Sequence, residues 1–169
     1  MSIALFQAIL FYVFGALALG AALVMVAQRN PTYSAFALIV TLVSLSAVFG
    51  LLGSPFIAAL QIIVYAGAIM VLFLFVLMLL NVRTEVRAPG EGRVFKLVAI
   101  GFGALLVGEI GSVLVAARPA LAGGFDASAR QVARLLFETQ YLYVFEATSI
   151  LILASLVGAI ALAKRDPSP

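Results

Sequence analysis

The sequence contains no cysteine and no histidine, and these absences exclude several kinds of chemistry. Without them the chain offers no disulfide, thiolate nucleophile, iron-sulfur ligand set, His-ligated haem or ordinary zinc site. Walker loops, dinucleotide fingerprints, HExxH motifs and GxSxG motifs with triad partners are also missing. We therefore expect no catalytic, cofactor-binding or metal-binding residues in this chain, so that any catalysis belongs to a partner.

Charged residues are scarce as well. Only 10% of residues are charged, against roughly a quarter in ordinary globular domains, whereas 65% are hydrophobic. Between Asn30 and Val82 there is no Asp, Glu, Lys or Arg. A helix needs roughly 20 apolar residues to cross about 30 Å of hydrocarbon, so this stretch predicts two membrane crossings separated by the turn Gly53-Ser54-Pro55. No basic patch interleaved with aromatic residues indicates nucleic-acid binding.

Hydropathy predicts an all-α integral membrane protein, with one membrane domain over residues 1–169. Five transmembrane helices are expected at about residues 3–27, 32–52, 56–80, 94–117 and 142–163. The first lacks a positively charged leader region and is too long for a signal-peptide core, so we expect it to be retained. The sequence Arg29-Asn30-Pro31 should end the first helix, and Thr32 should cap the second.

Two polar connections are expected in water, at residues 82–93 and 118–140. In the second, Arg130, Arg134 and Glu138 follow one another at intervals of four, beside apolar residues. This pattern indicates either a solvated connector or a short helix along the membrane interface.

The distribution of Lys and Arg predicts the orientation. Seven of them lie on the side reached after an odd number of crossings, and three lie on the other side. Because cytoplasmic loops carry the excess of positive charge, the amino terminus is expected outside, in the periplasm, and the carboxyl terminus in the cytoplasm.

Two glutamates interrupt expected crossings. Glu109 lies about eight residues from the outer end of the fourth, where an ionised carboxylate is costly. It is either a proton-relay or polar-cavity residue, or a side chain that faces a polar neighbour in a larger complex. Glu146 lies about five residues into the last crossing, where it either favours the helix dipole or carries protons.

The third expected helix contains a glycine among bulky residues. Gln61 and Tyr65 stand one turn apart, and Ala66-Gly67-Ala68 follows them. Small residues let helices approach closely, so this segment could be a packing notch. Because Gly67 also loosens the helix, it could instead be a hinge where the helix overwinds or bulges.

Residues 59–81, ALQIIVYAGAIMVLFLFVLMLLN, closely resemble the third helix of chain J of the bacterial NADH:quinone oxidoreductase, respiratory complex I. Asn30-Pro31 is also similar to that family. So is the final stretch, through Leu136-Phe137, Tyr141, Phe145-Glu146, Ser149 and Gly158-Ala159. The resemblance covers the first three helices and the last, and it is weaker around Gly90 and the fourth helix.

The resemblance implies a five-helix subunit in the membrane arm of a proton-translocating NADH dehydrogenase, in the bacterial inner membrane. Its implied partners are homologues of chains A, H and K, neighbouring antiporter-like chains and the lipid bilayer. The complex would use FMN, iron-sulfur clusters, NADH and quinone, none of them bound by this chain.

In that family the third helix can carry a π-bulge whose conversion to α-helix opens or closes a hydrated path. Carried over, the movable stretch is about residues 65–73. The implied gating residues are Gln61, Tyr65, Gly67, Met70 and Phe73, and Glu146 matches an acidic position of the family.

Two departures matter. Val144 stands where relatives often have Pro, which affects the entry to the last helix. Gln61 stands where some have Glu, which argues against an ionisable relay there.

Two other interpretations stay open on the sequence. The chain could be a passive assembly scaffold of the same complex, because small-residue notches fit that role equally well. It could also be the related subunit of a cation/proton antiporter or of a ferredoxin- or F420-linked oxidoreductase.

Overall fold

The computed structural model describes residues 3–80, 93–117 and 128–164, and these residues form helices joined by short turns, with no β-strand among them. The predicted all-α class is therefore confirmed for this part of the chain. The elements are α1 (Ile3–Ala27), α2 (Pro31–Leu51), α3 (Pro55–Leu60), the π-helix η1 (Gln61–Ile69), α4 (Met70–Leu79), α5 (Arg93–Ala117), α6 (Ala129–Leu136) and α7 (Leu142–Ala163).

Among the residues that the structure describes, four helical stretches are long and apolar enough to cross a membrane. They are Ile3–Ala27, Pro31–Leu51, Pro55–Leu79 and Leu142–Ala163, and the third is the continuous run of α3, η1 and α4. α5 holds a shorter apolar stretch, Leu97–Val113. In the sequence between α4 and α5, the expected connection, with its Pro89-Gly90, lies outside the described residues apart from Arg93.

The basic residues of the orientation count are only partly described. Arg83, Arg87, Arg118 and Arg165 lie outside the described residues, as does the first part of the connection expected at 118–140.

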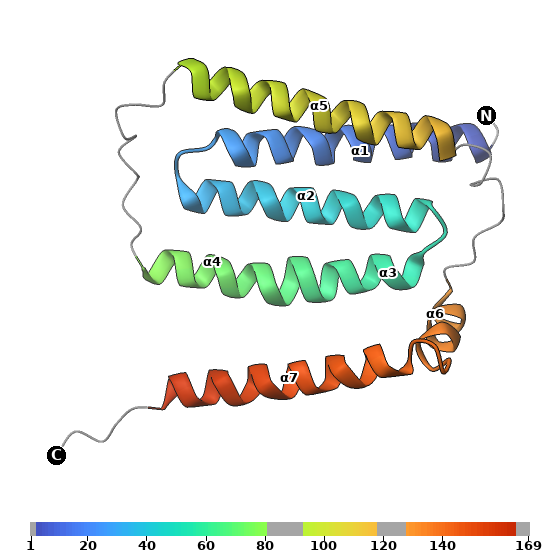
Figure 1. Cartoon of the computed structure of the whole chain (residues 1–169), viewed down its shortest axis with the longest axis vertical. Helices are drawn as coiled ribbons and strands as arrows, with labels where there is room; N and C mark the ends of the chain where they lie inside the picture. Colours follow the sequence, from blue (N-terminus) through green and yellow to red (C-terminus); the bar gives the residue numbers. More distant parts are fainter. Residues whose placement is uncertain (1–2, 81–92, 118–127, 165–169) are drawn as a thin grey trace.

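α2 is the central helix of the packed part of the chain. It lies between α1 on one side and the third span, formed by α3, η1 and α4, on the other (Figure 1). Its cap is Asn30, whose side-chain Oδ1 accepts a hydrogen bond from the Thr32 N–H at 3.0 Å. The expectation that Thr32 would be the cap was wrong, because the fixed φ of Pro31 suits the first helical position and moves the cap to the residue before it.

A tight corner joins α2 to the third span. Gly53 has a φ of 78°, a left-handed conformation that glycine adopts without steric cost. The Ser54 N–H then donates to the Phe49 carbonyl at 3.0 Å, and the Ala58 N–H donates to the Ser54 carbonyl at 3.0 Å. This corner fixes where α3 begins.

The interior is unlike that of a soluble protein, because small and polar side chains are inside and large apolar ones are outside. Lipid tails are as apolar as leucine, so membrane helices associate through close packing of small residues and interhelical hydrogen bonds. Two such bonds run from the Ser34 hydroxyl to the Met25 carbonyl, at 2.8 Å, and from the Ser46 hydroxyl to the Ala58 carbonyl, at 2.7 Å. The buried residues are Ala35, Ser44, Ser46, Ser54, Gln61, Ala66 and Met70.

Candidate functional site

The third span changes its helical geometry in the middle. Nine residues, Gln61–Ile69, form a π-helix with an α-helix on either side. At its end the Met70 N–H bonds to the Tyr65 carbonyl, five residues earlier, and also to the Gly67 carbonyl. π-helices are rare, usually extend for a single turn and are frequent at functional sites. The length of η1 makes it the leading candidate for the functional element of this chain.

The spacing of buried residues records the extra residue in η1. Gln61, Ala66 and Met70 are at most 9% exposed, so the buried positions follow one another after five and then four residues. A continuous α-helix from Gln61 would instead bury positions 65 and 69, because residues four apart share a face. Tyr65 and Ile69 are about half exposed. The π-helix therefore shifts the buried face of everything after it by one residue.

Gly67 fits closely against the backbone of η1. A Cβ atom built on it would lie 3.0 Å from the carbonyl oxygen of Ile62, five residues earlier. No other glycine in the described ranges would bring a Cβ within less than 3.9 Å of a neighbouring atom. In a π-helix residues five apart are hydrogen-bonding partners, so a side chain at position 67 would push against the backbone that defines this geometry. Glycine at this position thus favours the π form.

The structure divides the expected gating residues between two elements. Gln61, Tyr65 and Gly67 lie in η1, whereas Met70 and Phe73 lie in α4. The π-helix begins four residues before the movable stretch expected at residues 65–73. Gln61 is the first residue of η1 and is 9% exposed, so it is a buried polar residue in the element that packs against α2.

A pocket lies beside the carboxyl-terminal part of the third span. Its volume is about 150 Å³, and α4 contributes Phe73 and Leu77 to its wall. The remaining lining residues come from the end of α1 and the start of α2: Met25, Pro31, Ser34, Ala35 and Leu38.

The two glutamates that interrupt the expected crossings do not gather at η1. Glu109 lies in α5 and Glu146 in α7, and both residues are exposed. Neither carboxylate forms an ion pair with another residue of the described ranges. Glu146 is the fifth residue of α7 and lies outside its first turn, where the favourable effect of the helix dipole on a carboxylate is lost. Their surroundings in this chain therefore leave both carboxylates facing outward.

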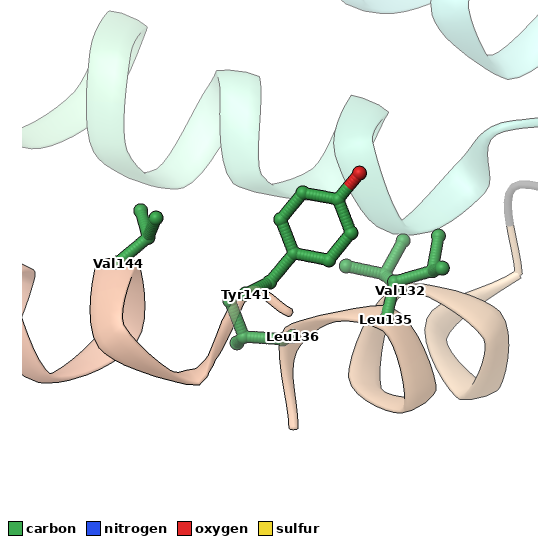
Figure 2. A pocket seen from close by; sticks show the side chains of 5 residues that line it. All are labelled: Val132, Leu135, Leu136, Tyr141 and Val144. Atoms are coloured by element: carbon green, nitrogen blue, oxygen red, sulfur yellow. The ribbon is translucent and has the colours of Figure 1, made fainter. Parts of the chain in front are cut away.

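A second feature is the junction of α6 and α7. The side chains that line a groove of about 280 Å³ are Val132, Leu135, Leu136, Tyr141 and Val144. Figure 2 shows the Tyr141 ring standing between Val144 and the side chains of α6. The rings of Phe137 and Phe145 pack edge to face, with 5.1 Å between their centroids. The segment that holds Arg130 and Arg134 is thus a short helix packed against the start of α7.

No three His, Cys, Asp or Glu residues gather in a possible metal site within the described residues.

The model of the family "NADH-ubiquinone/plastoquinone oxidoreductase chain 6" matches residues 21–162. The chain is 38% identical to the NAD(P)H-quinone oxidoreductase chain 6 of a Synechocystis species, covering 96% of this chain and 83% of that protein. It is 37% identical to the NADH-quinone oxidoreductase subunit J of Pseudomonas aeruginosa, covering 92% and 96%. With the corresponding Escherichia coli subunit the identity is 35%, covering 92% and 86%. The chain therefore belongs to the chain 6, or subunit J, family of the NADH-quinone oxidoreductases, as its third helix led us to expect.

Proposed function

We propose that this chain is a membrane-arm subunit of a proton-translocating NADH:quinone oxidoreductase, in which η1 helps to couple quinone reduction to proton translocation. The observation that carries the proposal is the nine-residue π-helix in the third span, which lies within the residues that the family model matches. Spans with two accessible helical registers can occupy two states, and a partner that prefers one state shifts the population toward it.

In this proposal the chain crosses the bacterial inner membrane five times, α5 being the fourth crossing. α1 starts at one end of the helical array and α7 ends at the other, as five crossings require (Figure 1). The excess of Lys and Arg after odd crossings supports a periplasmic amino terminus and a cytoplasmic carboxyl terminus. The resemblance to the family suggests homologues of chains A, H and K and an antiporter-like chain as the neighbours. Nearly all the described side chains of α5 and α7 are exposed, which leaves their faces available to such partners.

The chain itself neither binds NADH nor reduces quinone in this proposal. It has no cysteine to hold an iron-sulfur cluster. FMN, the clusters and the quinone site are assigned to partner subunits, and this chain supplies the moving helix.

The proposed movement exchanges the side chains that face α2. If η1 winds into an α-helix from Gln61 onward, Tyr65 replaces Ala66 and positions 69 and 73 replace Met70 and Leu74 on that face. Each residue of register corresponds to a rotation of roughly 100°. In the same step, Met70 and Phe73 exchange places as the bulky side chain that faces the neighbouring helices. Because water enters a cavity only where it is roomy and polar enough, this exchange opens or closes a hydrated path.

Substitution of Glu109 by Gln distinguishes two roles of this chain in the complex, a gate that borders a proton path and a passive scaffold. Gln keeps the size of the side chain and removes its charge, so a scaffold would assemble and turn over normally. If Glu109 borders the proton path, we expect the rate of proton translocation to fall roughly a hundredfold, the lower end of the range for general acid-base groups. The measurement is the initial rate of proton uptake by proteoliposomes that contain the purified complex. Ser112→Ala, one turn away on α5, is the control, because its hydroxyl bonds only to the Glu109 backbone carbonyl.

Co-purification tests the identity of the complex. We expect gentle detergent extraction of a tagged chain to retain flavin and iron-sulfur subunits with an NADH-oxidising site, detected by mass spectrometry and NADH oxidation. Recovery with ferredoxin- or F420-linked subunits, or with an antiporter alone, would instead support the second assignment that the sequence leaves open.

A further inference from the structure

The amino-terminal end of the third span is held to α2 by a hydrogen bond that crosses between helices. The Ser46 hydroxyl donates to the Ala58 carbonyl at 2.7 Å, and Ser46 is 3% exposed. Ala58 lies three residues before η1. A Cβ atom on Gly50 would lie 3.9 Å from the Cβ of Ala58, so the two helices are in close contact at this level. The left-handed turn at Gly53 ties the same end covalently.

Ser44 shows what is special about Ser46. It is equally buried, at 2% exposed, and its hydroxyl donates at the same distance, 2.7 Å. Its acceptor, however, is the Val40 carbonyl in the same helix. Of these two serines, only Ser46 bonds from α2 to the third span, and in apolar surroundings a bond of this kind is costly to leave unmade.

The other end of the third span has space beside it. The pocket next to Phe73 has walls on α1 and α2 that are fastened together, since the Ser34 hydroxyl donates to the Met25 carbonyl at 2.8 Å. Phe73 lines this pocket while 47% exposed. Apolar cavities of about 150 Å³ bind benzene, which has the size of a phenylalanine ring.

From these two ends we infer that Ser46 is a positioning residue that makes a register change in η1 move α4 and not α3. We further infer that the pocket receives the ring of Phe73 when the π-helix is lost. The fixed end is in α3, before η1, and the pocket lies beside α4, after η1. A register change in η1 is therefore expected to rotate α4 toward the pocket. This inference rests on the proposed function of η1. It adds to the proposed movement a fixed end at Ser46 and a pocket that receives Phe73.

Two substitutions in the purified whole complex test the receiving site. Ala35→Leu adds bulk at a position that lines the pocket and is 3% exposed. Ala37→Leu adds the same bulk two residues away, in a wider groove of about 410 Å³ between α1 and α2. We expect Ala35→Leu to lower coupled turnover roughly tenfold, since overfilling disfavours the state with Phe73 inside, and Ala37→Leu to change it less than about twofold. Leu38→Phe fills the pocket from another wall and serves if Ala35→Leu does not assemble.

Electron cryomicroscopy of the same complexes during turnover reports the register directly. Wild type should show a class in which η1 is α-helical, Phe73 occupies the pocket and Ala58 stays against Ser46. That class should be missing from Ala35→Leu. Ser46→Ala should add classes in which α3 rotates away from α2 and should lower turnover about threefold, whereas Ser44→Ala should match wild type.

Different results would overturn different parts. An α-helical class in wild type with α4 unmoved and α3 rotated would refute the fixed end and leave the gating function standing. An α-helical class equally populated in Ala35→Leu would refute the receiving pocket. Absence of any α-helical class in wild type, at rest and in turnover, would refute the gating function and this inference together.

Discussion

Replacing Gly67 with valine is expected to lower coupled NADH:quinone reductase turnover of the assembled complex about thirtyfold. A β-branched side chain at this position starts with a Cβ only 3.0 Å from the Ile62 carbonyl oxygen, so the π form is disfavoured. Overpacking of this kind costs about 2 kcal/mol, which shifts the ratio of π to α forms by roughly thirtyfold. The measurement is quinone-dependent NADH oxidation by membranes that contain equal amounts of assembled complex, judged by native gels.

Two controls belong with this variant. Gly15→Val, in α1, places the same side chain where a Cβ meets nothing within 4 Å, and should leave turnover within about twofold of wild type. Gly67→Ala should lie between wild type and Gly67→Val, because it meets the carbonyl without the branch. Normal turnover in an assembled Gly67→Val complex would count strongly against the gating role of η1.

Deleting Ile63 from η1 is expected to abolish most proton translocation while leaving the complex assembled. The buried positions 61, 66 and 70 show one residue more than an α-helix needs, so removal of one residue lets the span wind as α-helix with the present face of α4 kept against α2. The span then has no extra residue to form a π-helix, so the conversion between the π and α forms stops. We expect at least a tenfold loss of proton uptake in proteoliposomes, the size expected when a two-state element is held in one state.

The matched control deletes Val71, in α4, where the helix has no extra residue. That deletion should rotate the rest of α4 by roughly 100° and bring residues of the wrong face against α2, so assembly should fail. If both deletions impair assembly to the same extent, η1 is not the tolerant site that its geometry implies. Gly67→Val and the Ile63 deletion should also hold faces of α4 that differ by roughly 100° against α2, with Phe73 facing α2 in the first variant and Met70 in the second.

The positions of the long helices could be predicted from the sequence, whereas the register of η1 could not. Hydropathy reports how many apolar residues stand in a row, and the ends of the helices lie within one residue of the expected ranges. The α and π forms differ only in which carbonyl each N–H reaches, and they have the same composition. Because residues 62–80 are nearly all apolar, no periodic pattern marks the buried face. Gly67 was the one local sign of unusual geometry.

The polar features were predictable in kind but not in detail. Ser46 and Ser44 read alike in the sequence, and only the packing of α2 against α3 shows that one bonds across and the other within its helix. The cap of α2 moved to Asn30 because Pro31 itself starts the helix. Glu109 was recognisable as an exception in an apolar stretch, but its neighbours belong to other chains in the proposed complex.

The exposed faces of α5 and α7 have a consequence for the turnover of this protein in the cell. Every described side chain of α7 is exposed, and Glu146 is among them. A newly made copy that is not bound by partner subunits exposes these helix faces, and an ionisable carboxyl group in the proposed membrane span, to the proteases that clear unassembled subunits. We therefore expect its abundance to follow the supply of its companions and surplus copies to be degraded quickly.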